Sequence, residues 1–341
     1  MKAEHVLVTG GAGFIGSHTV VELLKAGFKV TVVDNLERSD YKIVEGIESI
    51  TKTKIDFHKI DCLDYAALDS LFAQNKFSSV IHFAAFKSVN ESVAEPINYY
   101  KNNVGSLITL LEVMKKNHVS DLIFSSSCTV YGQPDVIPVD ETAPFKRAES
   151  PYGATKQVCE RILEDAATVG FRVISLRYFN PIGAHESAVI GELPIGVPNN
   201  LVPYVTQTAA GVREKLTVFG SDYDTPDGSC VRDFIHVVDL AIAHVKAIQY
   251  VQGRTEINLF ETFNVGTGVG VSVLELIKKF MEVTGINVNY AIGARRAGDI
   301  EKVYANPRKI NQAFGWAPKY GLGEALLHAW NWEKRLKNPE S

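Results

Sequence analysis

Few cysteines, no long apolar run and no excess of basic residues narrow the classes to which this sequence can belong. Neither the four cysteines nor the nine histidines have metal-ligand spacing, so we expect buried, reduced thiols, no disulfide framework and no metal site. No apolar run approaches the roughly 18 residues of a membrane span. Too few residues precede the first expected strand, at His5, for a signal peptide. With a formal net charge of −4, we expect a cytoplasmic protein without nucleic-acid or membrane partners.

The first half of the 341-residue sequence alternates short apolar runs with helical patterns. The apolar runs predict strands at His5–Val8, Lys29–Val33, Ile55–Ile60, Val80–Phe83, Leu122–Phe124 and Val173–Leu176. The helical stretches between them include Ile15–Ala26, Ala66–Gln74 and Asn98–Lys116. Strands that alternate with helices are typical of βαβ units, so the expected fold class is α/β with a doubly wound parallel sheet.

The pattern changes after about Asn180. Gly and Pro become frequent between Pro181 and Pro203, and the strands shorten. We expect a dinucleotide-binding domain at 1–180 and a smaller α/β substrate domain at 181–341, with segments such as Asp233–Val238 able to return to the first.

A glycine-rich turn follows the first expected strand and opens the first helix. In Thr9-Gly10-Gly11-Ala12-Gly13-Phe14-Ile15-Gly16, the glycines let backbone N–H groups approach a pyrophosphate. Asp34 stands 18 positions after Gly16, at the end of the next strand, where a carboxylate binds a ribose 2′-hydroxyl and repels a 2′-phosphate. A purely structural turn is the alternative, but the context favours a Rossmann-type site for NAD rather than NADP.

A tyrosine and a lysine share one face of a later helix. Ser150 is a suitable N-cap and Pro151 a suitable first residue, which places Tyr152 and Lys156 one turn apart. Upstream, Ser125-Ser126-Ser127 follow an apolar run, so we expect their hydroxyls just past the carboxyl end of a strand, where such sheets bind ligands. Tyr-x-x-x-Lys alone also arises by chance on solvated helices, and Ser126 could simply bond at a strand end.

Together these features resemble the extended short-chain dehydrogenase/reductases, on the glycine loop, the run Ser125–Gly132 and Tyr152-x-x-x-Lys156. Further motifs are similar to the UDP-galactose (UDP-glucose) 4-epimerase family, over about Val6 to Trp316. They are Arg177–Pro181, Pro198–Leu201, Phe219–Tyr223, Val231–Val237 and Arg295-Arg296-Ala297-Gly298-Asp299.

The resemblance implies an epimerase that passes through a 4-keto sugar. It assigns the catalytic base to Tyr152, the lowering of that tyrosine's pKa to Lys156, and a hydrogen bond with the sugar 4-hydroxyl to Ser127. A free tyrosine has a pKa near ~10, and an ammonium or an oxidised nicotinamide nearby favours the phenolate.

The resemblance also implies which residues bind NAD and a UDP-hexose. The cofactor residues are Gly10, Gly13, Phe14, Ile15, Gly16, Asp34, Asn35, Leu36, Asp61, Cys62, Phe83, Ala84, Ala85, Lys87, Asn102, Ser125, Tyr152, Lys156 and Phe179, with Asp61-Cys62 ending the third strand. The substrate residues are Lys87, Ser127, Tyr152, Asn180, Asn199, Asn200, Leu201, Val218, Phe219, Arg232, Arg296, Asp299 and Val303. The arginines are assigned to the diphosphate and Asp299 to the uridine ribose. Ala85 stands where Gly is common, and it adds a methyl group near the expected cofactor.

Val303 follows Asp299 by four positions and borders the hexose in this family, where an aromatic residue would leave less room beside C2. We therefore hypothesise that UDP-GlcNAc and UDP-GalNAc are substrates too. The resemblance further implies a homodimer formed by the helices at Asn98–Lys116 and Tyr152–Ala166.

Two other functions share this fold. A nucleotide-sugar 4,6-dehydratase needs an acid/base pair just after the strand-end hydroxyl, where this chain has Cys128-Thr129, and Cys128 is expected to be a small packed thiol. A non-catalytic NAD-binding regulator would be expected to lose the tyrosine, lysine or serine, and all three are present.

Overall fold

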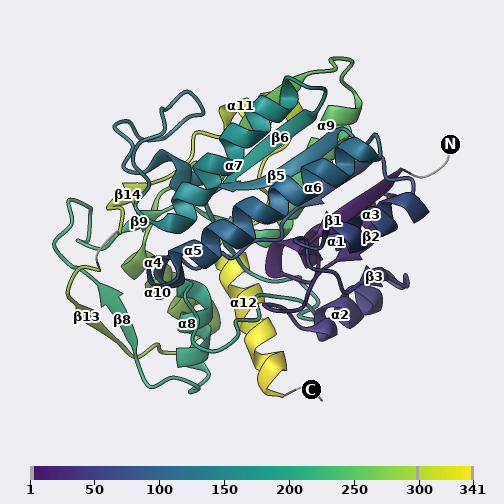
Figure 1. The fold of residues 1–341 in the computed structure, drawn as a ribbon. Helices are drawn as coiled ribbons and strands as arrows, with labels where there is room; N and C mark the ends of the chain where they lie inside the picture. The colour runs from purple at the N-terminus through teal and green to yellow at the C-terminus, as the bar shows by residue number, and fades with distance from the viewer. Residues whose placement is uncertain (1–3, 297–298, 339–341) are drawn as a thin grey trace.

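A seven-stranded parallel sheet forms the centre of the protein, in a computed structural model that describes residues 4–296 and 299–338. The order across the sheet is β11-β6-β5-β4-β1-β2-β3, and Figure 1 labels β6, β5, β1, β2 and β3 of this series. The strands are β1 (His5–Thr9), β2 (Lys29–Val33), β3 (Asp56–His58), β4 (Ser79–His82), β5 (Asp121–Ser127), β6 (Arg172–Tyr178) and β11 (Leu259–Val265). The expected fold class is confirmed.

The central strands are buried throughout because helices cover both of their faces. In β1, all five residues are buried. The sequence placed Ser125–Ser127 just past a strand, and this was wrong: β5 runs to Ser127 and pairs with β6 as far as Ser127 and Tyr178. The Ser126 hydroxyl is accommodated inside this strand because it donates to Glu160 of a neighbouring helix, as described below.

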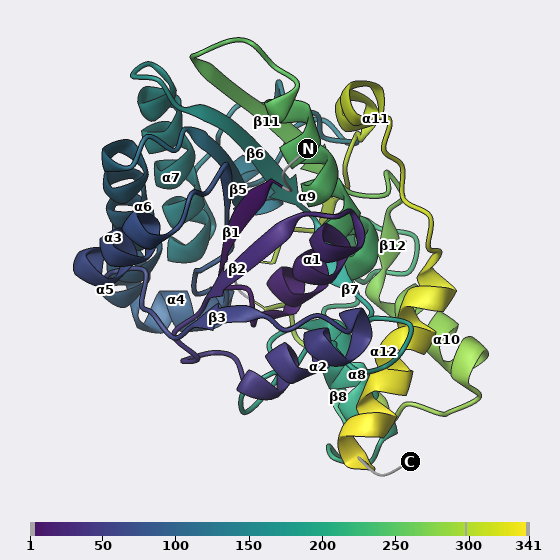
Figure 2. The same cartoon turned by 90° about the vertical axis from the view of Figure 1, so that its right-hand side faces the viewer.

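Two layers of helices enclose the sheet (Figure 2). On one face lie α1 (Phe14–Lys25), α2 (Tyr41–Thr51) and α9 (Val237–Gln252). On the other face lie α3 (Tyr65–Gln74), α6 (Gly105–Lys116) and α7 (Pro151–Ala167). Side-chain caps fix the N-termini of several of these helices. Asp64 accepts from the N–H of Ala67 at the start of α3, and Ser150 accepts from the N–H of Gly153 at the start of α7.

The helix expected at Asn98–Lys116 is interrupted. The short helix α5 (Pro96–Tyr99) leads into a π-helical turn at Tyr100–Val104, and only then does α6 begin. Within this turn, the Asn103 side chain bonds both the N–H and the C=O of Phe86 at 2.8 and 3.0 Å. A π-turn often marks a functional site, and this one connects the helix layer to the loop after β4.

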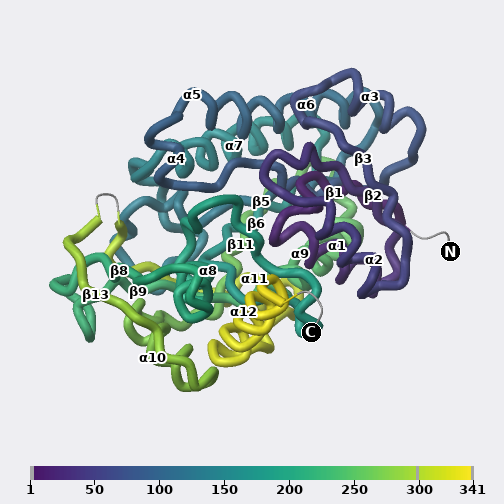
Figure 3. Tube along the Cα trace, turned by 90° about the horizontal axis from the view of Figure 1, so that it is seen from below, coloured from purple at the N-terminus to yellow at the C-terminus, as the bar shows by residue number. Residues whose placement is uncertain are grey.

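A smaller lobe lies beside the carboxyl ends of the strands (Figure 3). Its three small sheets are β7–β10, β8–β13 and β12-β9-β14. Their strands are β7 (Asn180–Ile182), β8 (Leu216–Phe219), β9 (Val231–Arg232), β10 (Phe234–His236), β12 (Val271–Ser272), β13 (Tyr290–Gly293) and β14 (Lys302–Val303). Its helices are α8 (Leu201–Ala209), α10 (Val273–Thr284) and α12 (Leu322–Lys337).

The chain leaves this lobe and returns to the large sheet. After β10, helix α9 packs on α1, and β11 then pairs with β6 in parallel from Leu259↔Arg172 to Val265↔Tyr178. The remaining helices are α4 (Val89–Ala94) and α11 (Arg308–Phe314). In the part of the chain that the structure describes, no helix is both long enough and apolar enough to cross a membrane.

The strand order reverses between β1 and β4, since β2 and β3 lie to one side and β4, β5 and β6 to the other. Open α/β sheets bind ligands at the carboxyl ends of the strands beside such a reversal. The carboxyl ends of β1, β4 and β5 meet at this edge. The loop after β1 carries the glycine turn, the loop after β4 carries the Phe83–Lys87 segment, and β5 itself ends in the three serines.

Candidate active site

The glycine turn between β1 and α1 has no room for side chains. Gly10 has a φ of +69°, and a Cβ there would lie 2.7 Å from the amide nitrogen of Ala84. A Cβ on Gly16 would lie 2.2 Å from the carbonyl oxygen of Gly10. Gly13 is the N-cap of α1 and brings no side chain to the helix end. Backbone N–H groups at this helix start are therefore accessible to a pyrophosphate, which fits a dinucleotide.

Asp34 follows β2 directly and is 8% exposed. Its carboxylate accepts hydrogen bonds from the N–H of Ala12, the N–H of Leu36 and the hydroxyl of Ser39, at 3.1, 2.9 and 2.7 Å. These bonds fix the carboxylate beside the glycine turn. A carboxylate has about four acceptor positions, so capacity remains for a ribose hydroxyl.

Other predicted cofactor residues lie around this turn. Asp61 and Cys62 do not end the third strand as expected, because β3 ends at His58, and they lie in the loop that follows. There Asp61 accepts from the Asn35 amide at 3.1 Å. Burial raises the pKa of the Cys62 thiol to about 12, with the Asp61 and Asp34 carboxylates acting in the same direction. Asn102 lies in the π-helical turn and donates to Asn103.

Tyr152 and Lys156 face the end of β5 from the first turns of α7. The ammonium nitrogen of Lys156 donates to the backbone oxygen of Ser125 at 2.6 Å, and it lies 5.9 Å from the centre of the Tyr152 ring. The Ser127 side chain hydrogen-bonds Tyr152 and also accepts from the N–H of Thr129 at 3.2 Å. The structure thus brings together the three residues that the sequence assigns to catalysis.

The charge states of this group depend on burial. Burial raises the pKa of Tyr152 to about 12, and the hydrogen bond with Ser127 opposes that rise. Burial lowers the pKa of Lys156 to about 8, while Cys159 and Glu160 oppose the fall. At neutral pH the lysine is therefore mostly protonated, and the tyrosine is neutral unless further positive charge is brought close to it.

The predicted diphosphate and ribose residues gather in the smaller lobe. The Arg296 guanidinium lies 2.6 Å from the Asp299 carboxylate, and the Arg232 guanidinium lies 4.0 Å from the same oxygen. The Arg296 guanidinium also lies 5.3 Å from the centre of the Phe219 ring. Two cations, a carboxylate and an aromatic ring in one place suit a nucleoside diphosphate. Ala297 and Gly298, of the same motif, lie outside the described residues.

The remaining predicted substrate residues differ in what they can offer. Asn180 begins β7, Asn199 is exposed, and Leu201 begins α8. Asn200 is the N-cap residue of α8, and its amide donates to Glu192 at 2.6 Å. Lys87, from the other lobe, pairs with the same Glu192 at 2.7 Å. Val218 is 1% exposed and packs in the core of the smaller lobe, so only its backbone is available to a ligand.

Val303 and Cys128 meet at one apolar cluster, which includes residues of the short turn after Ser127. Val303 is 2% exposed and packs in one apolar cluster with Val130, Tyr131 and Phe179, and Cys128 lies against that cluster. Three of the four thiols are buried as expected, but Cys128 is only partly buried. Desolvation nevertheless raises the pKa of the Cys128 thiol to about 12, so the thiol is protonated at neutral pH.

Sequence reasoning missed several buried polar residues that support the site. Asn103 ties the loop after β4 to α7, since its amide also donates to Thr155 at 3.2 Å. Asp233 is fully buried and accepts from the N–H groups of Thr267, Gly268 and Ala305. Glu160 binds Arg177 in the interior. Both Asp233 and Arg177 stood inside recognised motifs, but a sequence motif does not show which members point into the protein.

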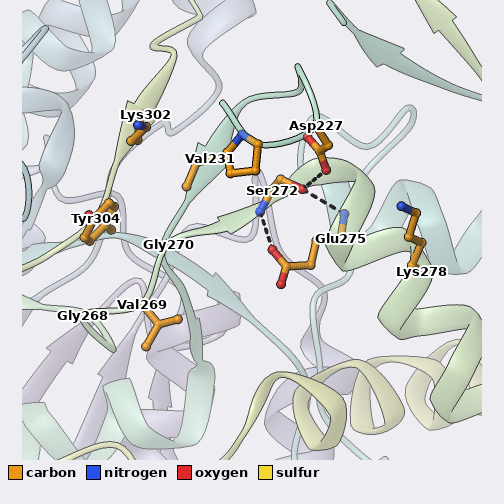
Figure 4. A pocket seen from close by; sticks show the side chains of 11 residues that line it. Asp227, Val231, Gly268, Val269, Gly270, Ser272, Glu275, Lys278, Lys302 and Tyr304 are labelled. Carbon is orange, nitrogen blue, oxygen red and sulfur yellow. Dashed lines mark hydrogen bonds between the residues drawn. The ribbon is translucent and has the colours of Figure 1, made fainter. Parts of the chain in front are cut away.

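A hollow of about 660 Å³ opens on the other face of the β12-β9-β14 sheet. The hollow is lined by residues that include Val231, Lys302 and Tyr304. Their chain neighbours Arg232 and Val303 do not line it, because successive side chains of a strand point to opposite faces of the sheet. Its polar groups bond to one another, with Ser272 joined to Asp227 and to Glu275 (Figure 4). This hollow is therefore separate from the candidate active site.

The chain is similar to known proteins over nearly its whole length. A family model described as GDP-mannose 4,6 dehydratase matches residues 7–328. UDP-glucose 4-epimerase of Bacillus subtilis is 49% identical over 335 residues, which cover 98% of each protein.

Two solved structures are similar throughout. UDP-glucose-4-epimerase from Stenotrophomonas maltophila, with bound NAD and formylated UDP-arabinopyranose, has a TM-score of 0.95 at 44% identity and covers 98% of this chain and 99% of that one. The enzyme from Bifidobacterium longum, in complex with NAD+ and UDP, has a TM-score of 0.93 at 45% identity with the same coverage. The chain therefore belongs to the UDP-glucose 4-epimerase family, within the extended short-chain dehydrogenase/reductases.

Proposed function

We propose that the protein is an NAD-dependent epimerase that interconverts UDP-galactose and UDP-glucose through a 4-keto intermediate. The observation that supports it most directly is the placement of Tyr152 and Lys156 beside Ser127, at the sheet edge that also carries the glycine turn. When bound, NAD supplies the hydride acceptor and donor for C4 of the sugar.

In this proposal Tyr152 removes the proton of the 4-hydroxyl, and Ser127 holds the same hydroxyl by a hydrogen bond. Because burial is the main cause that raises the pKa of Tyr152 to about 12, the tyrosine needs positive charge nearby to act as a base. The protonated Lys156 supplies one such charge, 5.9 Å from the ring. Lowering a tyrosine pKa from about 12 to about 7 takes ~7 kcal/mol of favourable interaction.

Inversion at C4 requires the 4-keto sugar to turn over and accept hydrogen on its other face. The nucleotide must therefore be held firmly while the hexose stays free to rotate. We assign the first task to Arg232 and Arg296 at the diphosphate and to Asp299 at the uridine ribose. Both guanidinium groups lie within 4.0 Å of the Asp299 carboxylate in the smaller lobe, which supports that assignment.

The test is to incubate the purified protein with UDP-galactose, without added NAD, and to separate the sugar nucleotides by chromatography. Conversion to a mixture with UDP-glucose is expected, and it would also show that the cofactor stays bound. If no conversion occurs even with added NAD and with the N-acetylated sugars, a non-catalytic NAD-binding regulator becomes the better proposal.

The nearest alternative reaction is 4,6-dehydration, which the description of the matching family model includes. That reaction needs an acid/base pair after the strand-end hydroxyl. At that place the chain has the Cys128 thiol, with its pKa raised to about 12, and the Thr129 hydroxyl. Neither group suits the removal of water across C5 and C6, so we retain the epimerase.

We propose further that UDP-GlcNAc and UDP-GalNAc are interconverted as well, because Val303 is smaller than an aromatic side chain at the place assigned to the hexose. Val303→Tyr is expected to lower kcat/KM for UDP-GalNAc at least tenfold and to leave that for UDP-galactose within a few-fold, since the larger side chain would fill the space beside C2. Both substrates are assayed with the wild-type protein and the variant.

Val303→Ala is the control for packing, since it also disturbs the apolar cluster around Val303 but adds no bulk. It should retain both activities. Wild-type protein that converts UDP-galactose but not UDP-GalNAc would contradict this part of the proposal.

We also propose a cytoplasmic homodimer. All four cysteines are free thiols, the state expected in a reducing compartment. The helices assigned to the dimer contact carry exposed apolar side chains, with Ile108 on α6 at 42% and Val158 on α7 at 39% exposure. Light scattering should give twice the mass of one chain.

Val158→Glu is expected to shift that mass towards the monomer, because a charge buried in an apolar contact without a partner is costly. Val169→Glu is the matched control: Val169 is 62% exposed and lies just after α7. If both variants remain dimeric, another surface forms the dimer.

A further inference from the structure

Three positions on one face of α7 meet three consecutive serines of β5. Tyr152, Lys156 and Glu160 are spaced four residues apart, so they follow one another along the helix at about 6 Å per step. Tyr152 bonds the Ser127 side chain, and Lys156 bonds the Ser125 backbone oxygen. Glu160 accepts from the Ser126 hydroxyl at 2.5 Å. The helix and the strand are therefore joined at three levels, two of which carry the residues assigned to the reaction.

Glu160 is itself held rigidly. It is 2% exposed, and the Arg177 guanidinium of β6 donates to it through Nε at 3.0 Å and through Nη2 at 2.6 Å. The Ser175 hydroxyl, also on β6, donates to the same carboxylate oxygen as Ser126, at 3.0 Å. A two-pronged arginine contact fixes the orientation of a carboxylate more closely than a single bond does.

Arg177 extends the connection beyond β6. It donates to the Tyr131 hydroxyl at 2.9 Å, and that hydroxyl donates to the Asn264 side chain at 2.7 Å. Tyr131 belongs to the short turn that follows Ser127, and Asn264 belongs to β11. Through these bonds Glu160 fixes the position of α7 relative to β5, β6 and β11. The flexible Lys156 side chain, by contrast, bonds the backbone of β5.

We propose that Glu160 is a positioning residue. It acts through Ser126 to hold α7 in a fixed position against the end of β5. Tyr152 and Lys156 are thereby placed beside Ser127 as the reaction requires. This inference rests on the proposed epimerase function. Charge supports it in a second way, because the Glu160 carboxylate, together with Cys159, opposes the fall in the Lys156 pKa that burial causes. The other titratable groups around Lys156 are Tyr152 on the same helix and His82 on β4, whose own pKa is lowered to about 3 by burial.

The chain offers a matched pair of variants for the test. Ser126→Ala and Ser175→Ala each remove one buried hydroxyl from the same oxygen of Glu160, but only Ser126 lies on the strand that carries Ser127. We expect Ser126→Ala to lower kcat for UDP-galactose at least tenfold with little change in KM, because a shift of about 1 Å in reacting groups can cost up to 10²-fold. Ser175→Ala should keep kcat within about threefold of the wild type. Both should lose similar thermal stability.

Equal loss of kcat in the two variants, or a loss in Ser126→Ala that falls entirely on KM, would overturn the positioning role. Crystal structures of both variants provide a readout that does not depend on turnover. In Ser126→Ala the distance from Lys156 Nζ to the Ser125 oxygen should lengthen from 2.6 Å, and in Ser175→Ala it should not. An inactive wild type would count against the epimerase proposal, and the crystal structures would then decide the positioning role on their own.

Discussion

Tyr152→Phe is expected to lower kcat for UDP-galactose by about 10²–10⁴-fold, the range typical of a lost general base. The substitution removes one hydroxyl and keeps the ring, which packs at the start of α7. Because Ser127 and Lys156 keep their places, binding of the nucleotide sugar should be little changed, so the loss should appear in kcat rather than in KM. Chromatographic assays over a range of substrate concentrations measure both constants.

Tyr250→Phe is the matched control for this prediction. Tyr250 lies on α9, and its hydroxyl donates to Glu261 at 3.0 Å. Its loss should leave kcat near the wild-type value. If Tyr152→Phe keeps more than a tenth of the wild-type kcat, another group must remove the proton, and the assignment of the base to Tyr152 fails.

Arg177→Met should lower the free energy of unfolding by about 3–5 kcal/mol, the usual cost of removing one partner of a buried ion pair. The reason is that Glu160, 2% exposed, would keep a charge with only the Ser126 and Ser175 hydroxyls to stabilise it. Urea denaturation followed by circular dichroism measures the change. A second substitution, Glu160→Gln, should restore much of the lost stability, because it removes the unpaired charge and keeps an acceptor for both serines.

Arg161→Met, on the same helix as Glu160, is the control for this pair. Arg161 contacts Glu164 and Asp165 at the surface with a side chain that is 70% exposed, and such pairs contribute little. A double variant no more stable than Arg177→Met alone would show that packing of the arginine, rather than its charge, stabilises the interior here.

The sequence predicted the large sheet well because its signal is local. The strand at Lys29–Val33 was placed with its bounds, and the glycine turn and Asp34 were found from their spacing. Strand ends were harder to predict where polar residues stay inside the sheet. Ser125–Ser127 do not look like a buried strand until their partners on α7 are known, and those partners lie about 30 residues later in the chain.

The catalytic assignments came from short motifs, but the supporting residues did not. Glu160 lies one turn beyond Lys156, yet nothing in the sequence shows that Arg177, 17 positions later, turns towards it. The π-helical turn at Tyr100–Val104 was also missed, and the bond that Asn103 makes within it to the backbone of Phe86 is a tertiary contact that a residue pattern does not show. Contacts between distant segments decide these features, and a residue pattern does not record them.

The return of β11 to the large sheet has a consequence for synthesis on the ribosome. Strand β6 ends at Tyr178, but its outer partner begins only at Leu259, so strands β7 to β10 and helices α8 and α9 are made between two neighbours of one sheet. Until Val265 has emerged, β6 has an open edge that can pair with another chain. Parallel pairing over such a long loop is also slow, so the nascent protein is most prone to aggregate during this interval, and chaperones would be most useful then.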